Sequence, residues 1–487
     1  MAKQRLEEIR KIRLEKVEKL REIGINPYPS KVKGTPKPIS TTLKSMGKTV
    51  EVAGRVMGWR EHGNVIFADL KDESGEIQLW FQKNSLGEQF KFLKFFDIGD
   101  FLYTKGKVTK TSAGEISVDV TDFQLLTKSI RPLPSTWHGL KDIEERYRQR
   151  YVDLLLNADV KRVFEVRTKV LKNMRKFLDD KGFIEVETPV LQPIYGGASA
   201  RPFITHQEAL DIDLYLRISD ELYLKRLIVG GFEKVYEVSK DFRNEGVDKQ
   251  HNPEFTQVEF YWAYADYNAL MQFTEDLLAF VIKESIGTYK IEYENTMLNF
   301  EPPIKKITYR ELIMENTGID LNLENTEERL GKAIKDKSLT LDLEGVVGYG
   351  ALVDTLYKTY ARPKVIQPTF LIDHPYELMP LAKRKPDDPS KIESFQLLVH
   401  GFEVLKAYSE LNDPKDQKDR WQQQEGLAKK GLAEHEALDE DYIRALEYGM
   451  PPTAGWGMGI DRLTALLTNQ HSLKDVILFP TMKPEGK

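Results

Sequence analysis

The segment Lys234 to Tyr261 constrains the fold of this chain more than any other stretch of its sequence. It reads KVYEVSKDFRNEGVDKQHNPEFTQVEFY, in which two alternating runs flank the polar stretch NEGVDKQHNPE. Because successive side chains of a strand point to opposite faces, each run has one apolar face and one polar face. The pattern predicts an antiparallel hairpin that packs one face on a core and leaves the other for polar contacts.

The polar face of this predicted hairpin carries a mixture of charged groups. Its members are Glu237, Ser239, Asp241 and Arg243 on the first strand, and Gln257, Glu259 and Tyr261 on the second. A charged strand face is often only solvated, and the pattern alone leaves that interpretation open. An arginine beside several carboxylates also suits a ligand with phosphate, carboxylate and ammonium groups, because a guanidinium can bind an oxyanion through two hydrogen bonds.

A second stretch, FQLLVHGFEVLKAYSELND at residues 395–413, places carboxylates among apolar residues of high strand propensity. Glu403 and Glu410 lie within it. A buried carboxylate needs a cation or hydrogen-bond donors. A Mg²⁺ ion, a substrate ammonium group, or salt bridges to Lys and Arg elsewhere would each meet that need, and the stretch alone does not choose among them.

Alternate glycines mark a third stretch, GMPPTAGWGMGIDRLTALL at residues 449–467. Gly455, Gly457 and Gly459 share one face of a predicted strand, which would let a flat ligand or another backbone approach closely. A helix is predicted directly after this strand, and Arg462 lies in its first turn. A phosphate at that place would meet both the guanidinium and the positive end of the helix.

The amino-terminal part of the chain has a different organisation. From Thr49 to about Thr127, short runs rich in β-branched and aromatic residues alternate with turn signals, and a helical piece, Phe90 to Phe96, follows the third run. Five strands with a helix after the third is the order of an OB-fold barrel, a fold that binds oligonucleotides. Phe67, Gln78 and Glu115 are the candidate contacts, although an aromatic residue on a strand is also common in a core.

The whole chain is predicted to be an α+β protein. The predicted parts are a basic helix and connector at 1–48, an OB-fold domain at 49–130, a Pro-containing linker at 131–150 and a larger domain at 151–487. The larger domain mixes helix and strand patterns without a βαβ rhythm, which favours an antiparallel sheet flanked by helices. The first 37 residues hold 11 Lys and Arg against 5 Glu, so the basic helix is either a solvated packing helix or also an RNA contact.

Composition excludes several kinds of function. The chain has 487 residues, no cysteine and a formal net charge of -5, which removes disulfides, thiolate metal sites and a cysteine nucleophile. No apolar run reaches the ~20 residues of a membrane span, and no signal-peptide pattern is present, so we expect a cytoplasmic protein with no membrane partner. The usual phosphate loop and the zinc-binding pattern His-Glu-x-x-His are also missing.

Together these stretches resemble the class II aminoacyl-tRNA synthetases, in the subgroup for lysine, aspartate and asparagine. GFIEVETPVL, with Pro189, is similar to motif 1, the dimer-forming helix and strand; FRNEG through HNPEFTQVEFY is similar to motif 2; and GWGMGIDR is similar to motif 3. GGASARPF, ELYLKR and SELND resemble the lysine-specific members. The resemblance implies an enzyme that activates L-lysine with ATP, transfers it to the 3′ end of tRNA(Lys), uses Mg²⁺ and forms a homodimer.

The resemblance also implies roles for individual residues. Arg243 and Arg462 would be catalytic, because both would hold the ATP phosphates. The rest of the ATP site would be Glu245, His251, Asn252, Phe255, whose ring would stack on adenine, and Glu403. The lysine site would be Gly197, Glu221, Glu259, Tyr261, Tyr408 and Glu410. Glu403 and Glu410 would bind Mg²⁺, and the barrel would contact the anticodon through Arg60, Phe67, Gln78 and Glu115.

Two positions depart from the pattern of the subgroup. Lysine-specific members usually have glutamate, a Mg²⁺ ligand, where Gln396 stands, and asparagine where Lys406 stands. An amide oxygen is a weaker ligand than a carboxylate for a hard cation, so Gln396 puts the full metal count in question. Lys406 would repel a cationic substrate if it points inward, or would replace part of the missing cation charge. The sequence leaves both interpretations open.

Three other functions are compatible with parts of the sequence. A synthetase of the same subgroup with another amino-acid specificity would account for Gln396 and Lys406. A non-catalytic RNA-binding paralogue would keep the fold, but the retention of Arg243 and Arg462 argues against it. A ligase that loads lysine onto a protein is disfavoured, because such relatives usually lack the barrel.

Overall fold

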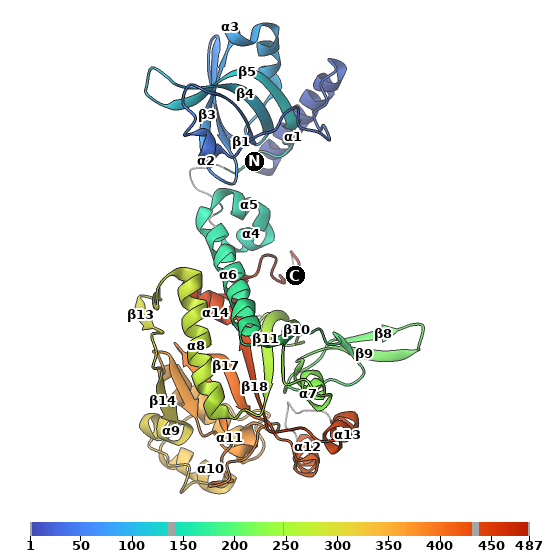
Figure 1. Cartoon of the computed structure of the whole chain (residues 1–487), viewed down its shortest axis with the longest axis vertical. Coiled ribbons are helices and arrows are strands. Elements are labelled where there is room, and N and C mark those ends of the chain that lie inside the picture. Colours follow the sequence, from blue (N-terminus) through green and yellow to red (C-terminus); the bar gives the residue numbers. More distant parts are fainter. Residues whose placement is uncertain (1, 135–139, 141, 247, 431–437, 486–487) are drawn as a thin grey trace. The chain divides into compact units, whose positions relative to one another are not determined.

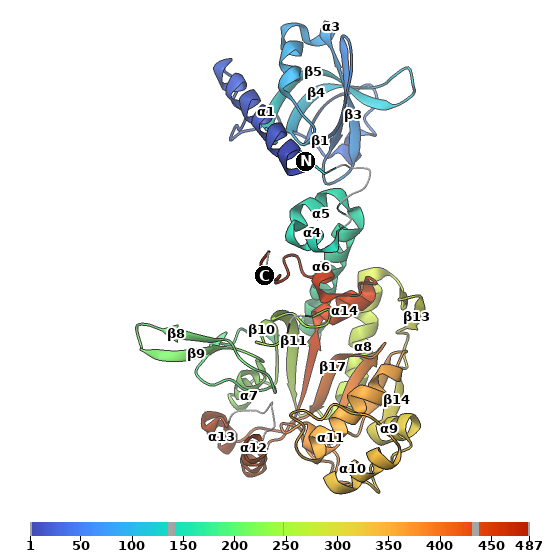
Figure 2. The ribbon, with the colours of Figure 1, turned by 180° about the vertical axis from the view of Figure 1, so that it is seen from behind.

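A computed structural model describes residues 2–134, 140, 142–246, 248–430 and 438–485. The chain divides into two compact units, Met1–Lys141 and Asp142–Lys487, which are drawn in Figures 1 and 2. Within the predicted linker at 131–150, residues 135–139 and 141 lie outside the described residues, and so does residue 247 in the loop of the predicted hairpin. Residues 143–148 of that linker form the first helix of the second unit.

The first unit is a closed β-barrel preceded by a basic helix. Helix α1 spans Ala2–Glu22 and α2 spans Ile39–Thr42. The strands β1 (Thr49–His62), β2 (Val65–Lys71), β3 (Glu76–Gln82), β4 (Phe101–Lys110) and β5 (Ile116–Thr127) close in the order β1-β2-β3-β5-β4. Helices α3 (Lys83–Leu86) and η1 (Gly87–Phe95) follow β3. The predicted order of an OB-fold, with a helix after the third strand, is confirmed.

Alternation along each barrel strand separates the core from the outer face. On β2, Ile66, Ala68 and Leu70 are buried and belong to the barrel core. Phe67 lies between them on the opposite face of the strand and stays half-buried. Period-two patterning of the sequence therefore fixes which side chains fill the barrel and which remain available on its surface.

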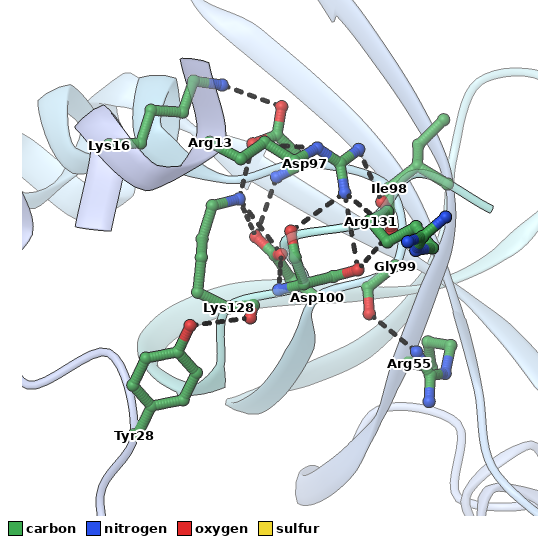
Figure 3. Close-up of polar contacts among 11 residues, drawn as sticks. Arg13, Lys16, Tyr28, Arg55, Asp97, Ile98, Gly99, Asp100, Lys128 and Arg131 are labelled. Atoms are coloured by element: carbon green, nitrogen blue, oxygen red, sulfur yellow. Dashed lines mark hydrogen bonds and ion pairs between the residues drawn. The ribbon is translucent and has the colours of Figure 1, made fainter. Parts of the chain in front are cut away.

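A buried polar cluster connects α1 to the barrel (Figure 3). We define the barrel cluster as Arg13, Lys16, Asp97, Asp100 and Lys128. The Lys128 ammonium bonds to both Asp97 and Asp100, and its Nζ lies 2.8 Å from Asp100 Oδ2. From α1, Lys16 Nζ lies 2.7 Å from Asp97 Oδ1, and Arg13 donates to main-chain carbonyls before β4 and after β5. Each charge in this cluster has a partner of opposite sign or a carbonyl acceptor.

The second unit is built on an eight-stranded sheet in the order β14-β15-β16-β17-β18-β11-β10-β6. The strands are β6 (Ile184–Glu185), β10 (Lys234–Phe242), β11 (Glu254–Ala263), β14 (Lys305–Thr308), β15 (Thr369–Ile372), β16 (Ser394–Val399), β17 (Phe402–Ser409) and β18 (Thr453–Gly459). Strands β10 and β11 pair antiparallel over their whole length, which confirms the predicted hairpin. Only the end pairs β14–β15 and β10–β6 of this sheet are parallel among the described strands.

Helices α6 (Ala158–Asp180), α8 (Tyr267–Ile286) and α14 (Ile460–Leu467) cover one face of this sheet. Their apolar side chains pack with Val258 and Phe260 of β11 and with Leu405 of β17 to form the main core. Figure 1 shows α6 and α8 running across that face. Because side chains alternate along β11, the polar residues of the hairpin point to the other face of the sheet.

The remaining elements frame that other face. Two further cores hold them, the first around α7 (Glu221–Val229), α12 (Pro414–Ala428) and α13 (Glu440–Glu447), the second around α9 (Tyr309–Thr317), α10 (Glu327–Asp336) and α11 (Tyr349–Leu356). Helix α11 runs into a π-helical turn, Tyr357–Ala361. A small sheet of β7 (Leu191–Gln192), β9 (Ile212–Leu216) and β8 (Ile204–Gln207) extends away from the main sheet (Figure 2). None of the helices within the described residues has the length and apolarity that a membrane crossing requires.

Candidate active site and nucleic-acid face

A cleft of about 1080 Å³ lies on the open face of the large sheet. The motif 2-like hairpin, β16, β17, β18 and the segment around α11 all contribute to its walls. Every residue predicted for ATP or lysine lines it, namely Gly197, Glu221, Arg243, Glu245, His251, Asn252, Phe255, Glu259, Tyr261, Glu403, Tyr408, Glu410 and Arg462. The structure thus brings together three stretches that are far apart in the sequence.

The alternate glycines of β18 form the floor of this cleft, which we call the glycine groove (Gly455, Gly457 and Gly459). In the register of the sheet Gly455 stands between Tyr261 and Tyr408 on the neighbouring strands. A Cβ atom built on Gly455 would lie 2.0 Å from Glu410 Oε1 and 2.6 Å from Tyr261 Cε1. A side chain at this position would collide with both residues, so glycine lets Glu410 and Tyr261 pack directly over the backbone of β18.

One end of the groove contains two carboxylates around a buried ammonium group. We define the cleft cluster as Glu221, Lys225 and Glu410. Lys225 Nζ lies 2.5 Å from Glu221 Oε1 and also contacts Glu410 Oε2. Tyr408 Oη donates to Glu221 Oε1 at 2.6 Å. Within the described residues Glu410 Oε1 is buried without a hydrogen-bond partner, and it faces the groove at Gly455.

Burial raises the pKa of Glu410 to about 8, and the nearby Lys225 charge opposes that rise. Sequence reasoning missed Lys225, although ELYLKR was among the quoted stretches. The signal was the spacing, because Glu221 and Lys225 are four residues apart on one helix and so share a face.

Further carboxylates surround the middle of the groove. Glu259 accepts hydrogen bonds from Ser219 Oγ and Tyr261 Oη, each at 3.3 Å. Burial, and then the charge of Glu221, raises the pKa of Glu259 to about 8. Both Asp220 carboxylate oxygens are buried without a hydrogen-bond partner among the described residues. This region holds more carboxylate than the protein's own cations satisfy, so it suits a cationic ligand.

The polar face of β10 is buried rather than solvated. Glu237 is 4% exposed, and Asp241 is completely buried. Arg217, which the sequence analysis did not single out, pairs with this face, since its Nη1 lies 2.6 Å from Glu237 Oε1 and its Nε lies 3.3 Å from Asp241 Oδ1. Both Asp241 oxygens nevertheless have no hydrogen-bond partner among the described residues. The interpretation of the hairpin as an ordinary solvated face is therefore wrong.

Gly197 lies beside the acidic region in a conformation that favours glycine. Its φ is +80°, and a Cβ at this position would lie 2.9 Å from Ser219 Oγ and 3.1 Å from Glu221 Cβ. Any larger residue would push against the wall of the cleft. The backbone at Gly197 can therefore approach the same ligand atoms as Glu221.

The other end of the cleft carries guanidinium groups. The Arg243 guanidinium lies 5.0 Å from the centre of the Phe255 ring and is 3.4 Å from the carbonyl oxygen of Ile218. Arg462 Nη1 donates to the carbonyl oxygen of Glu403 at 2.8 Å. Burial lowers the pKa of Arg462, Glu403 opposes this, and the like charges of Arg243 and Arg362 lower it further. The two predicted arginines therefore face one region, where an oxyanion would relieve their repulsion.

The rim of this end is polar. The loop between β10 and β11 places His251 and Glu245 at the surface, and His251 Nδ1 lies 3.0 Å from Asp248 Oδ2. Asn252 is buried, and its side chain donates to the Glu254 carbonyl at 2.7 Å. Asn252 Oδ1 has no hydrogen-bond partner among the described residues.

The two departures from the subgroup pattern lie side by side. Gln396 on β16 pairs with Lys406 on β17 in the register of the sheet, and both line the cleft. Gln396 Nε2 donates to Glu403 Oε2 at 2.9 Å. In the part of the chain that the structure describes, no group of three or more His, Cys, Asp or Glu side chains could hold a metal ion. A divalent cation at Glu403 would therefore need ligands from a bound substrate.

The barrel presents the residues predicted for the anticodon on adjoining strands. In the register, Arg60 on β1 stands opposite Phe67 on β2, and Phe67 opposite Trp80 on β3. The Phe67 and Trp80 rings stack with centroids 6.2 Å apart. Gln78, on the same side of β3 as Trp80, donates to Glu115 Oε2 at 2.9 Å.

Trp80 was not among the predicted residues, although alternation with Gln78 indicated its side of the strand. Its indole Nε1 is buried and has no hydrogen-bond partner among the described residues. Arg60 is bound to Asp69 through two short contacts, with Nη1 to Oδ2 at 2.6 Å and Nη2 to Oδ1 at 2.7 Å. Arg60, Phe67, Glu115 and Trp80 form one outer surface of half-exposed rings and exposed polar groups, whereas Gln78 on the same face of β3 is buried at 8% exposure.

Comparisons with known proteins agree with this architecture. Residues 142–483 match the family model described as tRNA synthetases class II (D, K and N), and residues 50–126 match the model described as OB-fold nucleic acid binding domain. The chain therefore belongs to the class II tRNA synthetases of the D, K and N group.

Several similar curated proteins carry the name lysine–tRNA ligase. The protein from Pelotomaculum thermopropionicum is 49% identical over 98% of this chain and 96% of its own length. The one from Carboxydothermus hydrogenoformans is 49% identical over 99% of this chain and 100% of its own length. The one from Clostridium tetani is 53% identical over 90% of this chain and 88% of its own length. The similarity covers both units of the chain.

Proposed function

We propose that this protein is a lysine–tRNA ligase, which activates L-lysine with ATP and then transfers it to tRNA(Lys). The relatives named above support this function over nearly the whole chain. The observation that carries the proposal is the buried, unpartnered Glu410 Oε1 at one end of the glycine groove, with Arg243 and Arg462 at the other end of the same cleft.

The proposed substrate lies along the glycine groove. Its ε-ammonium group would bind Glu410 Oε1, with the Tyr261 ring beside it. Its α-amino group would lie near Gly197, Glu221 and Glu259, where carboxylate is in excess. A neutral isostere would leave Glu410 without a partner, which gives this slot strong selectivity for a long primary amine.

The first step is proposed as an in-line attack of the lysine carboxylate on the α-phosphorus of ATP, with release of pyrophosphate. The carboxylate is already ionised at neutral pH, so no residue has to remove a proton. Arg243 and Arg462 orient the phosphates and stabilise the charge that builds up on them. The Phe255 ring, on which the Arg243 guanidinium lies, is the proposed platform for adenine.

Mg²⁺ is the proposed divalent cation of the site. It is usually bound by one or two carboxylates together with substrate phosphates and water, and Glu403 suits that arrangement. Glu410 is the second carboxylate predicted for the metal, but Lys225 contacts it and the substrate ε-ammonium group is proposed to bind there, so Glu403 is the carboxylate that we propose for Mg²⁺. When bound, the cation would neutralise charge on the ATP phosphates.

The second step requires the tRNA. The barrel at 49–130 is proposed to bind the anticodon through Arg60, Phe67, Gln78 and Glu115, with Trp80 as an additional stacking residue. The aminoacyl group then passes from the adenylate to the terminal 3′ hydroxyl of the tRNA.

A homodimer in the cytoplasm is proposed as the working form. Apolar side chains are exposed in the motif 1-like stretch and the β8–β9 hairpin, including Ile184 at 52%, Leu191 at 48%, Ile204 at 65% and Leu210 at 67%. Exposed apolar side chains in adjoining elements are typical of a protein–protein interface.

ATP–pyrophosphate exchange with each amino acid, followed by charging of a tRNA(Lys) transcript, tests the proposed function. Exchange stimulated by lysine together with charging is the expected result. Exchange with aspartate or asparagine alone would favour a different specificity, and no exchange would favour the non-catalytic paralogue. Lysine-stimulated exchange without tRNA charging would favour a protein acceptor. An Arg243→Ala variant should lose exchange while keeping the circular dichroism spectrum of the parent.

A further inference from the structure

Two cations in the cleft have no role in the function proposed above. We define the auxiliary cation pair as Arg362, which follows the π-helical turn after α11, and Lys406 on β17. Both line the cleft, and neither forms an ion pair with any described residue. Arg362 Nε is moreover buried without a hydrogen-bond partner in the described part of the chain. A cation held in a cleft in this way costs desolvation free energy unless an anion binds it.

The acids around this pair already have partners: Asp354 pairs with Lys358 at 2.7 Å, and Glu410 contacts Lys225 through one oxygen. Glu403 accepts a hydrogen bond from Gln396 Nε2 at 2.9 Å, and its main-chain carbonyl accepts one from Arg462 at 2.8 Å. Gln396 itself stands directly beside Lys406 in the register of β16 and β17. The amide at 396 brings no charge, so the wall that contains Gln396, Glu403 and Lys406 has as many cations as carboxylates.

Arg362 faces the same place as the two proposed phosphate-binding arginines. Burial is the largest cause of the lowered pKa of Arg462, and the charges of Arg243 and Arg362 lower that pKa further. Arg362 also lies close to Tyr357, whose hydroxyl is 3.4 Å from Gln396 Oε1. Three guanidinium groups from three separate elements therefore surround one region. Lys406 stands beside Gln396 on the neighbouring strand, with its ammonium group 5.7 Å from the centre of the Tyr408 ring, so it lies between this region and Glu410.

We propose that the auxiliary cation pair, Arg362 and Lys406, binds the triphosphate of ATP and supplies positive charge that a protein-bound divalent cation would otherwise supply. This inference rests on the proposed function, since it takes ATP as the ligand of the cleft. Fixed cations suit the position because a triphosphate offers many oxygens, and each ammonium or guanidinium can bind one or two of them. Among the described residues, no group of three or more His, Cys, Asp or Glu side chains could hold a metal ion. Fixed cations that replace a protein-bound metal ion would account for this.

Equilibrium binding of ATP to the full-length protein, measured by isothermal titration calorimetry with Mg²⁺ and again with EDTA, tests the inference. The unaltered protein should bind ATP under both conditions, with an affinity that falls by less than about tenfold in EDTA. A Lys406→Met or an Arg362→Gln variant should lose about a further tenfold in EDTA, because each charge-assisted hydrogen bond contributes about 1.5 to 3 kcal/mol. The same variants should lose much less when Mg²⁺ is present.

Three further variants sharpen the test. Lys406→Arg keeps the charge and should bind ATP in EDTA as the parent does. Lys385→Met removes a lysine that pairs with Asp373 outside the cleft, at 2.7 Å, and should change nothing. The double variant Gln396→Glu with Lys406→Asn adds an acid and removes a cation, and its ATP affinity should depend on Mg²⁺ by about a hundredfold.

The outcomes separate the inference from the proposed function. ATP binding by the parent only in the presence of Mg²⁺ would overturn the inference and leave the proposed function standing. An equal loss for Lys406→Met in Mg²⁺ and in EDTA would also overturn it. Absence of ATP binding under both conditions would overturn the proposed function and the inference with it.

Discussion

The barrel cluster and the cleft cluster are built from the same groups and differ in what they leave unpaired. Each places a lysine between two carboxylates, and both lysines are buried, Lys128 at 2% and Lys225 at 0% exposure. In the barrel, Asp100 receives the Lys128 ammonium and the Ser129 N–H, so its oxygens are satisfied (Figure 3). In the cleft, Glu410 has one oxygen against Lys225 and one oxygen without a partner among the described residues.

The difference separates a structural ion pair from a binding site. A buried charge without a full set of partners destabilises the fold, and such groups cluster at binding and catalytic sites, where a ligand completes the set. The barrel cluster is complete, so we expect its loss to cost stability alone. The cleft cluster is incomplete, so we expect the loss of its open carboxylate to cost substrate affinity more than stability.

The largest expected effect is that of Glu410→Gln. The amide cannot balance a substrate ammonium, and removing one partner of a buried charge pair costs about 4 kcal/mol, so kcat/KM for lysine in pyrophosphate exchange should fall about a thousandfold. Lys225 keeps Glu221, so the thermal midpoint should stay near that of the parent. Glu301→Gln, at an exposed position, is the control. A variant with normal lysine kinetics would place the substrate ammonium elsewhere.

Lys128→Met should have the opposite effect, lowering stability and leaving the exchange activity unchanged. It leaves Asp100 buried and unpaired, which should lower the free energy of unfolding of the first unit by about 3 kcal/mol. Lysine-dependent exchange, which we propose to take place in the second unit, should remain at the parent level. Scanning calorimetry of the full chain measures the loss of stability of the first unit. Lys105→Met removes a surface pair with Glu51 at 3.3 Å and should cost about 1 kcal/mol or less; an equal effect of the two changes would contradict the comparison.

A buried histidine makes the second unit sensitive to acid. His374 lies 2.8 Å from Ser394 Oγ through Nδ1, and burial lowers its pKa to about 3. Between pH 6.5 and 3 the unfolded chain binds a proton at this histidine and the folded chain does not, so stability falls as the pH falls. From pH 6.5 to pH 5 the free energy of unfolding of the second unit should fall by about 2 kcal/mol.

Urea titrations of the His374→Gln variant at pH 7 and at pH 5 measure this contribution. The variant should lose less stability between pH 7 and pH 5 than the parent, even if it is less stable than the parent at pH 7. His206→Gln, at an exposed position, should leave the difference between the two pH values unchanged. A parent-like acid response of His374→Gln would show that other groups determine it.

The smallest expected effect is that of Phe67→Ala on the barrel surface. Loss of one stacking ring should reduce kcat/KM for tRNA charging about tenfold, because base stacking contributes about 1 to 3 kcal/mol. Lysine-dependent exchange without tRNA should stay unchanged. If both activities fell equally, Phe67 would act through the fold rather than through RNA.

Much of the architecture followed from local patterns in the sequence. Period-two alternation predicted the β10–β11 hairpin, which agrees with the structure, whereas the sequence left open whether Phe67 lies in the core or on the surface of the barrel. The change from alternate glycines to a helical pattern located the end of β18 and placed Arg462 in the first turn of α14. These features depend on neighbours along the chain, which a pattern records directly.

Other parts of the site depend on contacts between distant segments. The sequence analysis did not single out Lys225 or Arg217, because only the fold brings Lys225 against Glu410 and Arg217 against Glu237. Arg362 belongs to a segment between 300 and 390 whose part in the site the sequence did not reveal. A single sequence does not report which charges converge, because burial and partner choice are properties of the packed chain.

The glycine groove has a consequence for attempts to change the amino acid that the enzyme accepts. At Gly455 the side chains of Glu410 and Tyr261 lie directly over the strand, so no side chain can be added there without displacing them, whereas the charge of the slot can be changed at Glu410. Substitution of the carboxylates would change which terminal group the site prefers on an unbranched amino-acid side chain. Bulky or β-branched amino acids would still meet the Tyr261 ring, and the glycine beneath it has no side chain whose removal would make room.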